Sequence, residues 1–218
     1  MAKQFDLIVF DWDGTLLDSA GAIVRAIQAS CVDMGLPVPP EARARHVIGL
    51  GLQDALAHAV PELSPGDYPV MVERYRHHYL AREHELALFD GAGALVKWLG
   101  EAGWTLAVAT GKSRKGLDRA LAHSGLTDHF QATRCADECF SKPHPAMLEE
   151  LMDELMVEAD RALMIGDTTH DLQMASNAGV RALAVTYGAH HPEQLSTAPS
   201  LAHLDSVEAL SSWLKLNG

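Results

Sequence analysis

The chain has 218 residues, of which 48% are hydrophobic, enough for one large domain or for a core domain carrying a smaller inserted one. Its 17 basic and 29 acidic side chains give a net charge of −12, which argues against nucleic acid or an anionic membrane as a partner. No apolar run approaches the roughly 20 residues of a membrane-spanning helix. The first residues lack a secretory signal pattern, so we expect a cytoplasmic protein without a membrane partner.

The cysteines and histidines show no metal-binding spacing. Cys31, Cys135 and Cys139 are odd in number and widely placed, which argues against a disulfide framework. We expect Cys135 and Cys139 to be small buried or half-buried residues. The neighbours His77-His78 and His190-His191 lack the i, i+4 spacing of a helical metal site, so we expect them at the surface.

An apolar run near the start of the chain leads two carboxylates into a glycine turn. Leu7 to Phe10 are continuously apolar, as in a strand buried on both faces of a parallel sheet. Because side chains alternate along a strand, Asp11 and Asp13 should leave its end on one side. Trp12 should face away, into the core or a pocket wall. Two carboxylates this close need a cation or a shared proton.

Residues 18–85 show helical periodicity and no convincing strand pattern. The Asp18-Ser19 pair offers an N-cap to a helix reaching about residue 34, and further helices are expected near 41–47, 53–60 and 64–84. We therefore expect an inserted all-helical domain at 18–85, with 1–17 and 86–218 forming the main domain. Its Gly49-Leu50-Gly51 segment is either a loop closing on a ligand or a plain turn between helices.

From Phe89 onward, short apolar strands alternate with helices. Strands are expected near 104–109, 131–134, 162–165 and 181–185, and Pro145 suits the first turn of an intervening helix. A loop near 197–199 precedes a last amphipathic helix. This alternation predicts an α/β fold with a doubly wound parallel sheet.

Three predicted strands end in polar residues, which are Asp11 and Asp13, Thr110, and Asp167 with Asp171. A fourth polar residue, Lys142, precedes a predicted helix. Parallel strands point their carboxyl ends the same way, so these groups should meet at one edge of the sheet. Taken singly, each has a simpler interpretation. Thr110 and Asp171 could cap helices, and Lys142 could be solvated.

The segments resemble, in order, the four motifs of the haloacid dehalogenase superfamily. Asp-x-Asp-Gly-Thr at 11–15 is similar to the first motif and Gly-Asp-x-x-x-Asp at 166–171 to the fourth, with Thr110 and Lys142 matching the second and third. The helical block resembles the cap that the phosphoglycolate phosphatase-like branch inserts after its first motif. The resemblance covers nearly the whole chain and implies a Rossmann-like core with an inserted helical cap domain.

The resemblance also implies an activity, the hydrolysis of a small phosphorylated metabolite with Mg²⁺ as cofactor. Asp11 would attack phosphorus and form an aspartyl-phosphate, while Asp13 would serve as acid and then base. The metal would be held by the side chains of Asp11 and Asp167, by the backbone carbonyl of Asp13, and by Asp171 directly or through water.

The remaining motif residues would bind phosphate. Lys142 would balance the carboxylates, and the Thr110 hydroxyl with backbone N–H groups at Gly111 would hold the phosphoryl oxygens. The net charge of −12 repels phosphate, so this local positive charge is required. Lys112 and His144 either touch the substrate or are surface groups, and His170 occupies a variable motif position without an assigned role.

Other functions stay open at this point. A sugar phosphomutase of the β-phosphoglucomutase type shares Asp-x-Asp and the cap, and differs in how slowly its aspartyl-phosphate reacts with water. Receiver signalling domains use a similar acidic cluster but are shorter and lack the insertion. A dehalogenase is disfavoured by Asp13, because halide release needs no acid. Neither the substrate nor the oligomeric state follows from the sequence.

Overall fold

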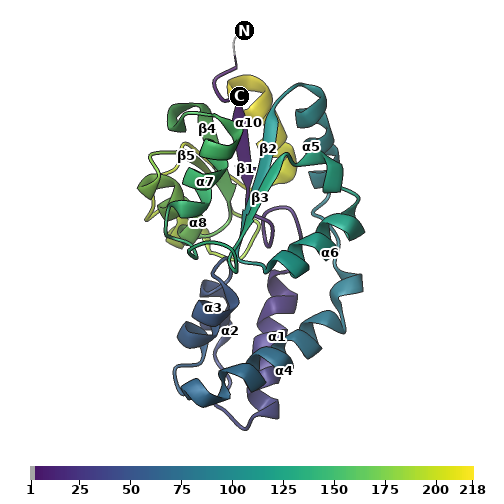
Figure 1. The fold of residues 1–218 in the computed structure, drawn as a ribbon, viewed down its shortest axis with the longest axis vertical. Helices are drawn as coiled ribbons and strands as arrows, with labels where there is room; N and C mark the ends of the chain where they lie inside the picture. The colour runs from purple at the N-terminus through teal and green to yellow at the C-terminus, as the bar shows by residue number, and fades with distance from the viewer. Residues whose placement is uncertain (1–2) are drawn as a thin grey trace.

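The computed structural model describes residues 3–218, which form a parallel sheet with helices on both faces and a second group of helices beyond one edge (Figure 1). The strands are β1 (Leu7–Phe10), β2 (Thr105–Thr110), β3 (Ala132–Cys135), β4 (Ala162–Gly166), β5 (Arg181–Val185) and β6 (His203–Leu204). The helices that belong with the sheet are α5 (Ala92–Glu101), α6 (Arg114–Ser124), α7 (Ala146–Leu155), α8 (Thr169–Asn177), α9 (Pro192–Leu195) and α10 (Val207–Asn217).

The order of the strands determines where a site can form. The sheet runs β3-β2-β1-β4-β5-β6, and every neighbouring pair is parallel. The connections therefore lead outward in one direction from β1 and in the other from β4. In such open sheets the crevice at the carboxyl ends of the strands beside this reversal is the usual ligand site. The residues that follow β1 and β4 are those of the first and fourth motifs.

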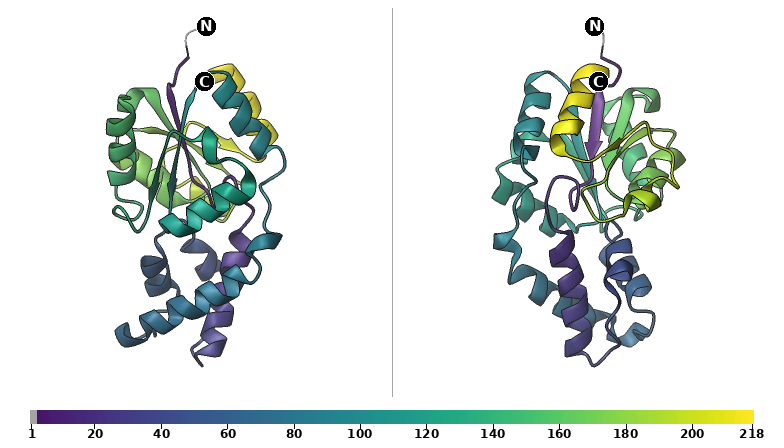
Figure 2. Two further views of the ribbon diagram at one scale, coloured as in Figure 1. Left: turned by 45° about the vertical axis from the view of Figure 1, so that its right-hand side comes forward. Right: turned by 180° about the vertical axis from the view of Figure 1, so that it is seen from behind.

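Alternation along the strands explains the two layers of the core. Ile8 and Phe10 pack on the face covered by α5 and α10, while Leu7 and Val9 pack on the face covered by α7 and α8. Figure 2 shows α10 beside α5 on the first of these faces. Trp12 continues the first face with no exposed surface and meets Phe130 edge-on at 6.3 Å between ring centroids. Trp12 is thus a core residue rather than a pocket wall.

The second group of helices, here called the cap, lies beyond the carboxyl edge of the sheet (Figure 1). It contains α1 (Ala20–Asp33), α2 (Glu41–His46), α3 (Leu52–Ala59) and α4 (Tyr68–Leu80). Apolar residues of α1 at steps of three and four, including Val24, Ile27 and Cys31, pack with Leu56 and Met71 in a separate buried cluster. The cap therefore has a hydrophobic core of its own.

Two adjacent segments join the cap to the sheet. The backbone N–H of Asp18 donates to the carbonyl of Ala87, and that of Phe89 donates to the carbonyl of Leu16. The chain thus leaves and re-enters the main body at one place. We propose residues 18–85 as a cap domain and 1–17 with 86–218 as a core domain, because the cap has a buried apolar cluster separate from those of the sheet.

The predicted α/β fold with an inserted helical cap is confirmed, with local differences. The strands β2 and β3 lie one residue further along the chain than expected, and Pro145 precedes α7 as its N-cap. The helix expected at 64–84 is α4 flanked by short 3₁₀ segments. Neither α9 nor β6 was predicted, since one helical turn and two strand residues are too short to show a period.

None of the helices between residues 3 and 218 combines the length and the apolarity needed to cross a membrane.

Candidate active site

Residues from the first, third and fourth motifs meet at the carboxyl edge of the sheet. Asp11 follows β1, Asp167 follows β4, and Lys142 comes from the loop before α7. Lys142 Nζ donates to Asp11 Oδ1 at 2.7 Å and to Asp171 Oδ1 at 2.6 Å. All four side chains are buried. Lys142 is therefore not a solvated lysine but the counter-charge of two carboxylates.

Burial and mutual charge shift the pKa values of Asp11 and Lys142. Desolvation raises the pKa of Asp11 well above its ordinary value, and the carboxylates of Asp171 and Asp167 raise it further against the opposing effect of Lys142. Desolvation alone would lower the pKa of Lys142, but the two carboxylates outweigh it and raise that pKa. Asp11 Oδ2 is buried and has no hydrogen-bond partner among the described residues. The nucleophile proposed from the sequence thus has one oxygen free.

Asp167 is held from two sides. Thr15 Oγ1 donates to its Oδ1 at 2.9 Å, and the backbone N–H of Ala189 donates to its Oδ2 at 2.6 Å. A Cβ at Gly188 would overlap the Asp167 carboxylate, so only glycine lets this backbone approach. Burial, followed by the charge of Asp171, raises the pKa of Asp167 to about 7. An arriving cation would reverse that shift.

Asp171 has both carboxylate oxygens engaged. Its Oδ2 accepts from the backbone N–H and from the hydroxyl of Thr168, at 3.0 and 2.6 Å, which completes a capping box at the start of α8. Its Oδ1 accepts from Lys142. The capping interpretation of Asp171 is therefore correct, and the same side chain also binds the motif lysine, while its contact with a metal stays a prediction.

Asp13 is bound by residues that the sequence did not assign to it. Ser19 stands at the N-cap position of α1, but its hydroxyl makes no capping bond and donates instead to Asp13 Oδ1 at 2.6 Å. Lys112 Nζ lies 3.0 Å from the same oxygen and also donates to the Tyr79 hydroxyl of α4 at 3.0 Å. Lys112 is therefore a buried group at the junction of core and cap rather than a surface lysine.

The second motif is in direct contact with the cap. Thr110 ends β2, is fully buried, and accepts from the backbone N–H of Lys112 at 3.2 Å, while Ser113 is the residue that caps α6. A Cβ at Gly111 would collide with backbone carbonyls of residues 48–51, here called the cap loop. The cap loop is also fixed at its end, where Gly51 N–H donates to Ser141 Oγ at 2.9 Å. It rests on the site rather than forming an isolated turn between helices.

The acidic residues suit a divalent cation. Oxygens of Asp11, Asp167 and Asp171 lie within 4.8 Å of one another, which is close enough to surround one ion. The raised pKa values of Asp11 and Asp167 both mark carboxylates without enough positive charge nearby. Carboxylate oxygens are the ligands of hard divalent cations. A metal would complete this site.

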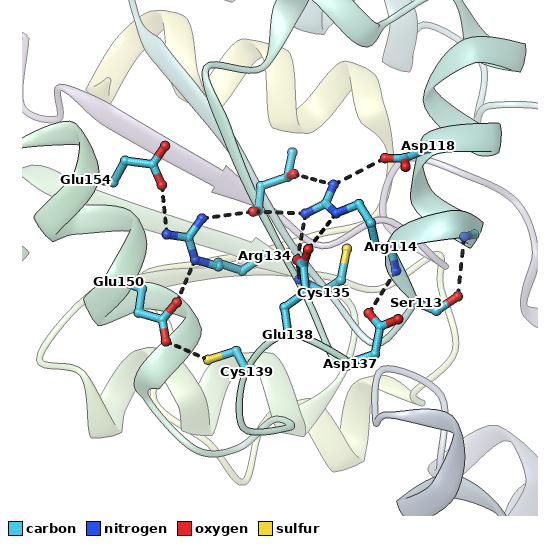
Figure 3. Close-up of polar contacts among 12 residues, drawn as sticks. Ser113, Arg114, Asp118, Arg134, Cys135, Asp137, Glu138, Cys139, Glu150 and Glu154 are labelled. Carbon is cyan, nitrogen blue, oxygen red and sulfur yellow. Dashed lines mark hydrogen bonds and ion pairs between the residues drawn. The ribbon is translucent and has the colours of Figure 1, made fainter.

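A polar network next to the site connects the second motif to the loop of the third. Arg114, at the start of α6, binds Glu138 through two hydrogen bonds of 2.7 and 2.8 Å. Arg134 of β3 reaches Glu150 and Glu154 of α7 at 2.7 Å each (Figure 3). Cys135 is buried and Cys139 is half-buried, as expected, and both lie within this network. These contacts fix the segment that leads to Lys142.

Three histidines gather where α2 meets the core, which corrects one expectation. His190 is buried, with 2% of its surface exposed, and is not a surface residue. His170 Nε2 and His190 Nε2 lie 2.7 and 3.1 Å from the backbone carbonyl of His46. The sequence misses this arrangement because the residues are more than a hundred positions apart or lie on different elements.

This histidine cluster is better suited to hydrogen bonding than to metal binding. The backbone N–H of Thr169 donates to His190 Nδ1, so the proton of that ring belongs on Nε2, facing the His46 carbonyl. The rings of His46 and His190 are stacked, with an interplanar angle of 14°, and their in-plane lone pairs therefore do not converge. The cluster joins the cap to the core.

A cavity of about 700 Å³ opens beside the site, between the cap and the loop that carries Lys142. His144, left open by the sequence, lines it and stacks on Phe140 with ring centroids 4.5 Å apart. Among the site residues predicted from the sequence, Lys142 is the one that reaches this cavity.

The chain resembles known proteins over nearly its full length. It is 34% identical to the probable phosphatase IndB of Dickeya dadantii, covering 97% of this chain and 96% of the relative. It is 32% identical to a phosphoglycolate phosphatase of Vibrio vulnificus, covering 96% and 99% respectively. A crystal structure of a predicted phosphoglycolate phosphatase from Haemophilus somnus superposes with a TM-score of 0.86 at 24% identity, and 100% of each chain is covered.

Residues 8–185 match the family described as haloacid dehalogenase-like hydrolase. The match contains the first and fourth motifs, the cap and strands β1 to β5, except for Leu7 at the start of β1. The resemblance inferred from the motifs and the expected class of enzyme, a hydrolase, are thereby confirmed. The chain belongs to the haloacid dehalogenase-like hydrolase family.

Proposed function

We propose that this chain is a Mg²⁺-dependent phosphatase that hydrolyses a small phosphate monoester, phosphoglycolate or a close analogue, through an aspartyl-phosphate on Asp11. The observation that supports it best is the pairing of Asp11 with Lys142 beside a free Asp11 Oδ2. One carboxylate oxygen is held in place by a permanent cation, and the other is available to attack. Of the relatives reported above, one is named a probable phosphatase and another a phosphoglycolate phosphatase, which supports the proposed class of reaction.

In the first half of the reaction, Asp11 Oδ2 would form a bond to phosphorus while the bond from phosphorus to the ester oxygen breaks. Asp13 would give its proton to the departing alkoxide. Thr110 and the backbone at Gly111 would donate to phosphoryl oxygens, and Lys142 would neutralise their charge. Ser19 would hold Asp13 in place for the transfer, since its hydroxyl is 2.6 Å from Asp13 Oδ1.

In the second half, Asp13 would accept a proton from water as the water oxygen attacks phosphorus. The bond between phosphorus and Asp11 then breaks, and inorganic phosphate leaves with the Asp11 carboxylate restored. Splitting the hydrolysis into two steps matters, because phosphate monoesters are among the slowest substrates in water and require accelerations of up to ~10²¹.

The metal would be held by Asp11 and Asp167, by the Asp13 backbone carbonyl, and by Asp171 through water. When bound, Mg²⁺ supplies positive charge that offsets the carboxylates and the phosphoryl oxygens. The residues themselves already exclude water from this space, since Asp11 is fully buried and Lys142 is 2% exposed.

The test is release of inorganic phosphate from p-nitrophenyl phosphate and from a panel of small phosphorylated metabolites, with Mg²⁺ or with EDTA. We expect activity to be lost in EDTA and in Asp11→Asn. Asp6→Asn is the matched control, because Asp6 precedes the same strand at its other end and pairs with Arg161 on the surface. Full activity in EDTA or in Asp11→Asn would contradict the proposal.

The mutase alternative predicts a different product. A sugar 1-phosphate would then yield its 6-phosphate isomer, whereas the phosphatase yields free sugar and inorganic phosphate. Product analysis on one sugar phosphate separates the two. A cytoplasmic location remains a prediction, to be checked by fractionation of the source cells.

A further inference from the structure

Lys112 is a second buried lysine at the site, and the reaction proposed above gives it no task. Its side chain is 9% exposed, and its Nζ lies 3.0 Å from Asp13 Oδ1 on the core side. On the cap side it donates to the Tyr79 hydroxyl at 3.0 Å. Lys112 thus connects core and cap, next to the carboxyl that would meet the leaving group.

Positioning Asp13 does not require Lys112. The Ser19 hydroxyl already donates to the same Asp13 oxygen, at the shorter distance of 2.6 Å and from the segment that directly follows the first motif. An ammonium group has three N–H donors, and the part of the chain that the structure describes gives this one two acceptors. A buried cation with an unfilled donor is costly unless a ligand completes its shell.

Tyr79 offers a further donor at the same point. Its oxygen accepts from Lys112, so its own O–H is free to donate, and no acceptor for that proton occurs within residues 3–218. An ammonium N–H and a phenol O–H side by side make a pair of donors suited to a carboxylate, whose two oxygens only accept. One donor comes from the core and the other from the cap.

The two buried lysines lie on opposite sides of the reaction. Lys142 binds Asp11 and Asp171, on the side of the nucleophile. Lys112 contacts Asp13, on the side of the leaving group. A cation on the leaving-group side would suit a leaving alcohol that is itself anionic.

We propose that Lys112, together with the Tyr79 hydroxyl, binds a carboxylate carried by the leaving alcohol, and so selects esters such as phosphoglycolate over uncharged esters of the same size. This inference rests on the proposed function and adds the specificity residue. Because Lys112 Nζ and Asp13 Oδ1 are 3.0 Å apart, the carboxylate must be attached close to the ester oxygen. Binding it would also join core to cap around the substrate.

The experiment compares phosphoglycolate with its isosteric amide, phosphoglycolamide, by kcat/KM. A charge-assisted hydrogen bond corresponds to a preference of about 10- to 100-fold for the carboxylate in the unaltered protein. In Lys112→Met we expect this preference to fall to near unity, and in Tyr79→Phe to fall in part. Lys115→Met, an exposed lysine on α6, is the matched control and should keep the preference.

The ratio between the two esters separates recognition from positioning. If Lys112 only orients Asp13, Lys112→Met slows both esters by the same factor and the preference persists, which overturns the proposal. A leaving group that lies instead in the cavity lined by His144 gives no preference in the unaltered protein and overturns it as well. If the unaltered protein hydrolyses none of the phosphoesters, p-nitrophenyl phosphate included, the proposed function itself is overturned.

A second measurement needs no variant and so does not depend on Lys112→Met folding. Glycolate should inhibit hydrolysis of p-nitrophenyl phosphate by the unaltered protein about 10-fold or more strongly than glycolamide does. Equal inhibition by the two compounds would overturn the assignment of Lys112.

Discussion

Replacing Asp13 by asparagine tests the central chemical assignment with little change in shape. Ser19 and Lys112 both donate to Asp13 Oδ1, and an amide oxygen has lone pairs for both. The asparagine side chain can therefore keep these contacts, although the bond to Lys112 loses its charge. We expect a loss of about 1 kcal/mol in the free energy of unfolding. What disappears is the proton that Asp13 gives to the leaving oxygen.

The size of the catalytic effect should depend on the leaving group. General acid catalysis contributes about 10²- to 10⁴-fold, and an alkoxide needs it far more than p-nitrophenolate does. Initial rates of phosphate release from phosphoglycolate and from p-nitrophenyl phosphate should thus fall unequally in Asp13→Asn, with the larger loss on phosphoglycolate. Metal affinity, measured by calorimetry, should change little, because the backbone carbonyl of Asp13 is the expected ligand.

Equal losses on both esters would refute the assignment of leaving-group protonation. A large fall in metal affinity would point instead to a role for the Asp13 side chain in holding the ion. Ser19→Ala supplies a milder version of the same test. It removes the 2.6 Å hydrogen bond but leaves the acid, so a smaller loss with the same leaving-group trend is expected.

Burial, followed by the charge of Asp171, raises the pKa of Asp167 to about 7. Metal affinity should therefore rise with pH up to about 7 and level off above it. Calorimetry that shows the same affinity from about pH 5 to 8 would argue against this. In the metal-free protein, the raised pKa of Asp167 contributes to the stability of the folded state. This contribution is fully present below the ordinary pKa of 3.8 and is lost as pH rises through about 7, which thermal unfolding at a series of pH values would show. Gly111→Ala should push the cap loop away, raise KM and lower the free energy of unfolding by about 1–3 kcal/mol. Gly66→Ala, whose new Cβ would meet only the Ser64 hydroxyl at 4.0 Å, should do neither. Arg114→Met breaks the partly exposed ion pair with Glu138 and should lower the free energy of unfolding in urea by about 1 kcal/mol, with kcat nearly unchanged. A large fall in kcat would mean instead that the polar network controls the loop that carries Lys142.

The elements that carry the site could be predicted from the sequence because their signals are local. A continuous apolar run followed by Asp11 and Asp13 identifies a buried strand and its carboxyl end without knowledge of the rest of the chain. The spacing of Val24, Ile27 and Cys31 identifies a helix in the same way. Elements too short to repeat a period, such as β6, carry no such signal.

The sequence by itself determined the order of the motifs, the α/β class and the insertion of a helical cap, since these depend on periodicity and on residue types at short spacing. Only the tertiary structure decided which groups meet. It directs Ser19 to Asp13 instead of to a helix end, buries His190 against the cap, and gives Asp171 both a capping role and a bond to Lys142. It also brings Lys112 to Tyr79, on another domain by our proposal. The contacts of Lys142, His190 and Lys112 join residues far apart in the chain, and the packing of whole elements, rather than any local preference, fixes them.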